Sequence, residues 1–134
     1  MQYRKLLTVA MMLIGTFAAD AGYKGYNVTG EGSRIKTLYG LASYYADKFD
    51  GRETANGEVY DHNKMTAACN VLPLGTWIRV TNISNSKSVI VHTNDRLHIR
   101  MKRLVDLSRS AAEILGYTRK GLTQVKVEVL QKEQ

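Results

Sequence analysis

Regular alternation of apolar and polar residues constrains the fold of this chain most. In residues 123–130, valines at every second position alternate with Gln, Lys and Glu. Residues 76–82 and 88–93 show the same pattern, and a polar Ser-Asn-Ser-Lys stretch between them predicts a hairpin turn. A period of two places successive side chains on opposite faces of a strand. These segments therefore predict strands that each bury one face.

Shorter apolar segments complete the predicted set of elements. We expect further strands at residues 38–45, 65–69 and 104–107, with Gly40 marking a bulge or a close backbone approach. Ser108 is a suitable N-cap for a helix that ends at Leu115, and Gly116 is a suitable terminator. About six strands, one helix and two polar loops, 46–64 and 94–103, indicate a small barrel or sandwich whose site lies at its loops.

The first residues have the features of an export signal. A basic start precedes an apolar run over residues 6–19, and Ala19-Asp20-Ala21 offers a cleavage site. The run is shorter than the ~20 apolar residues that a membrane-spanning helix needs. We therefore expect a signal peptide at 1–21, a flexible Gly-rich leader at 22–37 and the folded domain at 38–131. The mature protein is expected to be exported to the periplasm or cell envelope, soluble and without a membrane anchor.

Charge and cysteine content exclude several classes of protein. The formal net charge of +7 suits attraction to anionic wall polymers, but no nucleic-acid motif accompanies it. A single cysteine cannot form an intramolecular disulfide, so packing must hold the fold. The three histidines and this cysteine lack metal-ligand spacing, so we expect no metal and no cofactor. We expect a monomer.

Several motifs, in order along the chain, resemble the rare lipoprotein A family. They are Gly40-Leu-Ala-Ser-Tyr-Tyr, Thr54-Ala-Asn-Gly-Glu-Val-Tyr-Asp61, Met65-Thr-Ala-Ala, Leu72-Pro-Leu-Gly-Thr, Asn94-Asp-Arg96, Val105-Asp-Leu-Ser108 and Val125-Lys-Val-Glu-Val-Leu130. The resemblance implies a mainly β fold, a six-stranded double-psi β-barrel with one short α-helix. It also implies an endolytic peptidoglycan transglycosylase, a carbon–oxygen lyase that cleaves naked glycan strands to 1,6-anhydro-muramyl products.

Such a lyase needs one well-placed carboxylic acid. The acid protonates the glycosidic oxygen and then, as a base, removes the proton from the C6 hydroxyl of the same sugar. Ordinary glycosidases instead need two carboxylates at a set separation. The reaction therefore predicts one acid with a raised pKa, flanked by polar groups that orient the sugar.

Three carboxylates are candidates for the catalytic machinery. The resemblance implies Asp95 as an active-site acid, whereas its ordinary role would be a turn residue paired with Arg96. Asp106 matches the acid of the wider barrel superfamily, but it could instead accept hydrogen bonds from the first turn of the helix. Glu58 matches a residue that lines the family site, and otherwise it would be a solvated loop residue.

Five further residues are predicted to contact the glycan: Tyr45, Tyr60, Asp61, Cys69 and Arg96. The tyrosines, with Tyr44 and Trp77, could stack on sugar rings, although core packing is the commoner role of aromatics in a small barrel. Asp61 could equally serve a turn. Cys69 is expected to form a small, partly buried part of the cleft wall.

Two departures from the family pattern concern the predicted site. Cys69 stands where the family has a histidine, and Leu97-His98-Ile99 replaces Gly-Pro-Phe. His62 or His98 could supply an imidazole from a neighbouring loop. These departures keep two alternatives open, a non-catalytic glycan-binding or wall-loosening module like the expansins, and a thiol hydrolase that uses Cys69.

Overall fold

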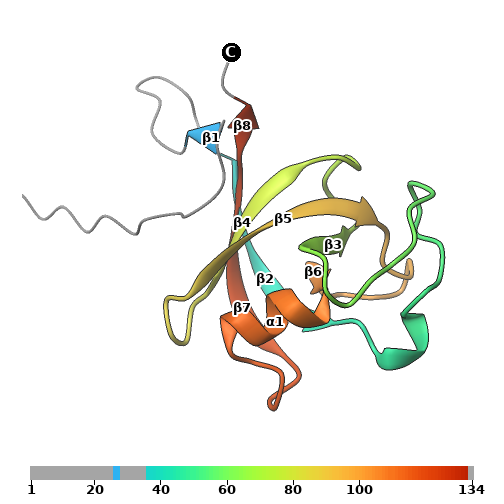
Figure 1. Cartoon of the computed structure of the whole chain (residues 1–134). Coiled ribbons are helices and arrows are strands. Elements are labelled where there is room, and N and C mark those ends of the chain that lie inside the picture. Colours follow the sequence, from blue (N-terminus) through green and yellow to red (C-terminus); the bar gives the residue numbers. More distant parts are fainter. Residues whose placement is uncertain (1–25, 28–35, 133–134) are drawn as a thin grey trace, which may run out of the picture.

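A closed barrel of six strands, in the order β2-β6-β3-β5-β4-β7, forms the body of the chain (Figure 1). The computed structural model describes residues 26–27 and 36–132. The predicted signal peptide and most of the predicted leader lie outside the described residues. Within the described part of the chain, no helix is both long and apolar enough to cross a membrane.

The barrel strands follow the predicted segments closely. Their bounds are β2 (Thr37–Tyr44), β3 (Thr66–Cys69), β4 (Trp77–Asn82), β5 (Ser88–Asp95), β6 (Val105–Leu107) and β7 (Thr123–Val129). A mainly β fold with a six-stranded barrel and one short α-helix, α1 (Arg109–Leu115), confirms the expected fold class. The sequence missed a second, two-stranded sheet in which β1 (Tyr26–Asn27), inside the predicted leader, pairs with β8 (Gln131–Lys132).

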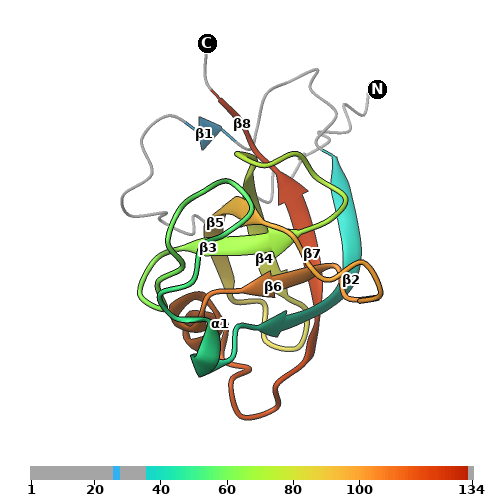
Figure 2. The same ribbon diagram turned by 90° about the vertical axis from the view of Figure 1, so that its right-hand side faces the viewer.

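The barrel contains both parallel and antiparallel strand pairs. The strand β2 pairs in parallel with β6 and antiparallel with β7, so that Thr37 faces Glu128 and Ala42 faces both Val105 and Thr123. The strand β3 pairs in parallel with β5. Both views show β2 and β7 side by side, although they are the first and the last barrel strands along the chain (Figures 1 and 2).

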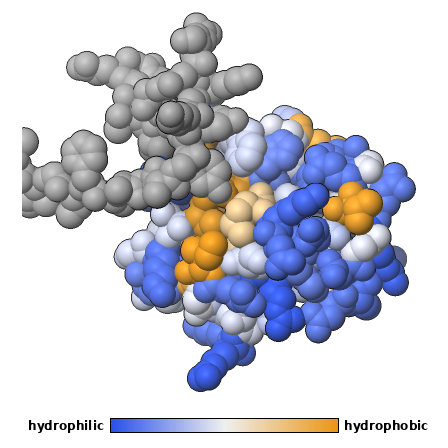
Figure 3. All heavy atoms as spheres, viewed as in Figure 1, coloured by the Kyte–Doolittle hydropathy of each residue, from blue (hydrophilic) through white to orange (hydrophobic). Residues whose placement is uncertain are grey.

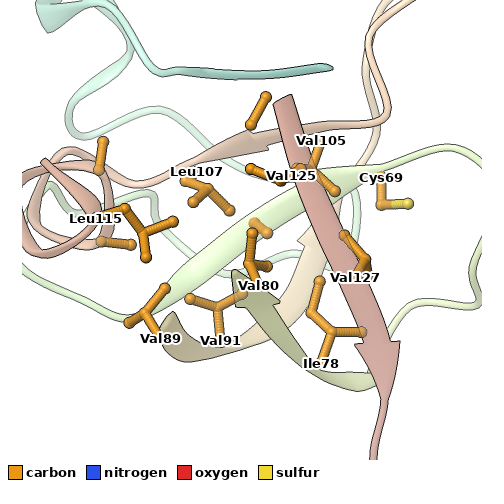
Figure 4. Packing of buried hydrophobic residues seen from close by; sticks show 14 of the residues in the cluster. Cys69, Ile78, Val80, Val89, Val91, Val105, Leu107, Leu115, Val125 and Val127 are labelled. Carbon is orange, nitrogen blue, oxygen red and sulfur yellow. The ribbon is translucent and has the colours of Figure 1, made fainter. Parts of the chain in front are cut away.

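Small and branched apolar side chains fill the barrel interior, as the alternation of apolar and polar residues along the strands predicted (Figure 4). Ile78, Val80, Val125 and Val127 are all fully buried. The outer face is different, because hydrophilic side chains dominate the surface in view and apolar side chains form only small patches (Figure 3). The predicted inward faces of β4 and β7 are therefore confirmed.

The helix begins and ends where the sequence predicted. The Ser108 hydroxyl accepts a hydrogen bond from the Ala111 N–H at 3.3 Å, and Gly116 ends the helix with φ at +77°. The buried Asn82 amide donates to the Leu115 carbonyl oxygen at 2.9 Å. This bond satisfies a free carbonyl group at the helix C-terminus and attaches the helix to the barrel.

Three local predictions concern the segments around the site. A Cβ atom on Gly40 would lie 2.8 Å from Leu104 Cβ, so the predicted close approach is confirmed. The predicted loop at 46–64 carries a 3₁₀ helix, Asp47–Phe49, and a bridge between Glu53 and Val59. The strand β5 extends two residues beyond its predicted end and so reaches Asp95.

Candidate active site

A pocket of about 520 Å³ lies on the outer side of the barrel, where β2 and β5 end beside β3 and β6. Tyr45 follows β2, Asp95 ends β5, Ala68 lies on β3 and Asp106 lies on β6. The 3₁₀ helix and the loop after β5 form the remaining walls. The pocket therefore brings together two of the three predicted acids on rigid strands.

Three donors hold the Asp95 carboxylate. Its Oδ1 atom accepts hydrogen bonds from the backbone N–H of Ala55 at 2.9 Å and of Arg96 at 2.8 Å. Its Oδ2 atom accepts from the Tyr45 hydroxyl at 2.5 Å. Because the donors come from three different segments, the orientation of this carboxylate is fixed by the fold and not by one flexible turn. The sequence did not indicate the contact with Ala55.

Tyr45 is the side chain that holds Asp95 from the barrel side. Its ring stacks on Tyr60 with centroids 4.0 Å apart and planes 17° from parallel. Burial, and next the hydrogen bond to Asp95, raise the pKa of Tyr45 far above its ordinary value. Tyr45 therefore stays protonated and remains a hydrogen-bond donor to Asp95 across the physiological range.

Tyr60 supports Tyr45 from behind instead of lining the pocket. It is 2% exposed, and its hydroxyl lies 2.8 Å from His62 Nδ1. His62 Nε2 in turn lies 3.2 Å from a carboxylate oxygen of Asp47. A chain of contacts thus runs from the surface to the residue that orients Asp95, and His62 is engaged in it and does not reach the pocket.

Asp106 is paired with Arg103. The guanidinium donates Nε to Oδ1 at 2.9 Å and Nη2 to Oδ2 at 3.0 Å. The hydrogen bond to Asp106 raises the pKa of Arg103. The alternative role at the helix start is not observed, since the hydroxyl of Ser108 caps the helix. The sequence did not indicate this pairing, because a spacing of three residues predicts a side-chain contact only on a helix.

Glu58 lies beside the pocket lining, on the loop that also contacts Asp95. Its Oε1 atom accepts from the Asn56 amide at 2.7 Å, and Oε2 accepts from the Asn94 amide at 3.2 Å. These two hydrogen bonds lower the pKa of Glu58. Glu58 is therefore an exposed, charged group held next to the strand that carries Asp95.

Cys69 does not form the expected wall of the pocket. Its side chain is 0% exposed and belongs to the barrel core (Figure 4), whereas the neighbouring Ala68 faces the pocket. The pleat explains the difference, because Cys69 pairs with Val105 and Ala68 pairs with Asp106. The thiol therefore packs as a small apolar group, away from any substrate in the pocket.

The remaining predicted contacts divide between the pocket and its surroundings. Arg96 lines the pocket, and its guanidinium donates to the carbonyl oxygens of Cys69 and of Leu72, the latter at 2.6 Å. Asp61 accepts from the Asn63 N–H at 2.8 Å and closes a turn outside the pocket. Trp77 contacts His92 at 4.8 Å between ring centroids and is not a pocket residue.

The pocket also contains residues that the sequence did not single out. Lys48, Phe49 and Met101 line it, and so does His98, which was expected only as a substitute imidazole. No motif identified the first two, because the short 3₁₀ helix that carries them lies inside a segment that reads as a polar loop. Among the residues that the structure describes, no three His, Cys, Asp or Glu side chains are grouped so as to hold a metal ion.

The buried tyrosines make the stability of the fold sensitive to alkaline pH. Burial raises the pKa of Tyr60 to about 12, and it raises the pKa of Tyr45 and Tyr117 further. Unfolded tyrosine releases its proton near pH ~10, so above that pH the unfolded chain binds fewer protons and the free energy of unfolding falls. We expect the urea midpoint to drop steadily between about pH 10 and 12, and a midpoint that stays constant while phenolate absorbance rises would contradict this expectation.

Comparisons with known proteins agree with the geometry. Residues 37–127 match the family described as lytic transglycolase. The chain is 51% identical over 96 residues to the endolytic peptidoglycan transglycosylase RlpA of Pseudomonas aeruginosa strain UCBPP-PA14, covering 72% of this chain and 28% of that protein. It is 41% identical over 126 residues to the protein of the same name from Rickettsia bellii, covering 83% of this chain and 56% of that protein.

Two solved structures share the fold at low sequence identity. A Streptomyces papain inhibitor superposes with a TM-score of 0.59 at 19% identity, over 72% of this chain and 96% of the inhibitor. An expansin of Clavibacter michiganensis superposes with a TM-score of 0.56 at 23% identity, over 74% of this chain and 52% of the expansin.

The family match extends over most of the barrel, from the first residue of β2 to Val127 in β7. The chain spans about a quarter to a little over half of the length of the two curated relatives above. The match, the closed six-stranded barrel and the ordered motifs lead to one assignment: this chain belongs to the lytic transglycolase family, as a rare lipoprotein A-like double-psi β-barrel.

Proposed function

We propose that this domain is an endolytic peptidoglycan lytic transglycosylase, which cleaves naked glycan strands to 1,6-anhydro-muramyl products. The observation that carries the proposal is the Asp95 carboxylate, held by three hydrogen-bond donors in the wall of an open pocket. Relatives named as enzymes of this activity, at 51% and 41% identity, support the same conclusion.

Asp95 is the acid and then the base in this proposal. As an acid it gives its proton to the glycosidic oxygen, and the bond between that oxygen and C1 of the muramic acid breaks. As a base it then takes the proton of the C6 hydroxyl, whose oxygen bonds to C1 and closes the 1,6-anhydro ring. Asp95 regains its proton and no water is consumed, so a single carboxyl group completes the cycle.

The surroundings of the two aspartates favour Asp95 over Asp106 for this role. Both oxygens of Asp106 already accept from the Arg103 guanidinium, so Asp106 would have to break an ion pair to deliver a proton. Asp95 accepts only from backbone N–H groups and from the Tyr45 hydroxyl. Tyr45 is a positioning residue that keeps Oδ2 directed along the pocket wall.

Glu58 is proposed to position the sugar. Its pKa is lowered by the Asn56 and Asn94 amides, so it stays charged and suits acceptance of hydrogen bonds from sugar hydroxyl groups. Its attachment to Asn94 also links the loop that contacts Asp95 Oδ1 to the strand that carries Asp95. Tyr45 and Arg96, which line the pocket, are proposed to contact the glycan directly.

One observation favours a non-catalytic glycan-binding module of the expansin type. The family histidine position is occupied by Cys69, which is fully buried, and His62 is engaged by Tyr60 and Asp47. His98 alone brings an imidazole to the pocket lining among the described residues. A thiol hydrolase is not supported, because a thiol without exposed surface cannot reach a substrate.

The cellular setting completes the proposal. The N-terminal basic and apolar pattern supports export to the periplasm or cell envelope, where peptidoglycan is the available glycan. We propose that the protein acts there as a monomer.

Digestion of purified sacculi tests the proposed function. Sacculi with and without stem peptides are incubated with the purified protein, and released fragments are identified by mass spectrometry. We expect anhydro-muramyl products from the peptide-free strands. Binding of strands without any product would favour the expansin-like module, and products with a reducing-end muramic acid would indicate hydrolysis instead.

A further inference from the structure

The charges that line the pocket are not balanced. Two carboxylates, Asp95 and Asp106, face three cationic side chains, Lys48, Arg96 and Arg103. Arg103 is neutralised by Asp106 in a two-point ion pair. Even with both carboxylates ionised, the lining therefore has an excess of positive charge, beside the acid that the reaction requires.

The excess charge lies on Lys48 and Arg96. The Arg96 guanidinium donates to two backbone carbonyl oxygens, which orient it without neutralising it. Among the described residues, Lys48 has no carboxylate within ion-pair distance, and its ammonium lies 5.2 Å from the centroid of the Phe49 ring. A cation that lines a pocket and lacks a carboxylate partner attracts an anion that enters the pocket.

We infer that Lys48, with Arg96, forms a carboxylate subsite that takes the free lactyl carboxylate of an N-acetylmuramic acid residue. This inference rests on the proposed function and concerns the substrate of the same pocket. In a naked strand every muramic acid carries this carboxylate, and a single negative charge would offset the excess positive charge in the lining. A stem peptide converts the same carboxylate into a neutral amide and adds bulk.

The subsite gives a physical reason for selecting peptide-free strands. A carboxylate that meets an ammonium forms a charge-assisted hydrogen bond, whereas an amide in the same place leaves the ammonium without a counter-ion. Selection would then operate at binding, through Lys48, and independently of the proton transfers that Asp95 carries out.

Binding to the uncleaving Asp95→Asn protein tests the subsite. The two probes are a peptide-free tetrasaccharide of alternating N-acetylglucosamine and N-acetylmuramic acid, and the same compound with its lactyl groups converted to methylamides. We expect calorimetry to show about tenfold tighter binding of the carboxylate form. Adding Lys48→Gln is expected to remove that preference, and Lys48→Arg to keep it. Lys120→Gln, an exposed lysine outside the pocket, is the matched control and keeps it too.

The outcomes separate this inference from the function on which it rests. Equal binding of the two probes, or a preference that survives Lys48→Gln, would overturn the subsite while the transglycosylase proposal stands. Failure of the folded protein to bind either probe would overturn both. Loss of affinity for both probes by the same factor in Lys48→Gln would show that Lys48 contacts another part of the glycan, which also overturns the carboxylate subsite.

Discussion

Replacing Asp95 with asparagine is expected to lower the rate of anhydro-muramyl product release by at least about a hundredfold, the usual loss when a general acid–base group is removed. The amide cannot give a proton to the glycosidic oxygen or take one from the C6 hydroxyl. Its carbonyl oxygen can still accept from the N–H groups of Ala55 and Arg96, and its amino group can face the Tyr45 hydroxyl. The fold should therefore be unchanged, and glycan binding should persist.

Two variants control for this result. Asp106→Asn alters the other carboxylate of the pocket. We expect this variant to retain activity to within about tenfold, since the substitution removes the ion pair with Arg103 and not the proposed proton donor. Glu113→Gln makes a similar change on the exposed face of α1, where the Glu113 carboxylate accepts from Arg109, and is expected to leave the rate unchanged. Release of products is followed by mass spectrometry and folding by circular dichroism. A larger loss in Asp106→Asn than in Asp95→Asn would reverse the assignment of the acid.

Truncating Leu107 to alanine is expected to lower the free energy of unfolding by about 2–5 kcal/mol. Leu107, the last residue of β6, is 0% exposed, and its side chain lies in the core cluster (Figure 4). Its backbone also pairs with Ala67 on β3 and accepts from the Tyr45 N–H at 3.1 Å. Because the interior is closely packed, the removed methyl groups leave a cavity that neighbouring side chains fill only in part.

The exposed Leu122 gives the matched control for this change. It is 43% exposed, so Leu122→Ala is expected to change stability by less than about 0.5 kcal/mol. Both variants are measured by urea unfolding with fluorescence and circular dichroism as probes. A loss below about 1 kcal/mol in Leu107→Ala would show that the core can collapse around the deleted side chain.

The sequence predicted those parts of the fold that depend on a short local pattern of residues. Alternating valines specify strands with one buried face, and Ser108 and Gly116 specify the ends of the helix, because capping depends on a few neighbouring residues. The pairing of β1 with β8 was not predictable in this way. Each strand is two residues long, and its partner lies at the other end of the described chain.

The structure places the predicted candidate Asp95 in the pocket lining, but the surroundings of Asp95 could be predicted only in part. The motif around Asn94-Asp95-Arg96 identified a candidate acid, but the role of Ala55 depends on a backbone N–H that no side-chain pattern records. Cys69 was expected in the cleft because of its position in the motif. Which face of β3 it occupies depends on strand pairing, and Lys48 likewise reaches the pocket only through the tertiary fold.

The pairing of β2 with β7 has a consequence for the order of folding. These strands are the first and last of the barrel in sequence, and they close it along a register from Thr37 with Glu128 to Ala42 with Thr123. Contacts between such distant segments cost loop-closure entropy before they contribute stability, so folding is expected on the order of milliseconds to seconds rather than microseconds. The barrel therefore cannot close until β7, its last strand in sequence, has been synthesised and is free to pair with β2.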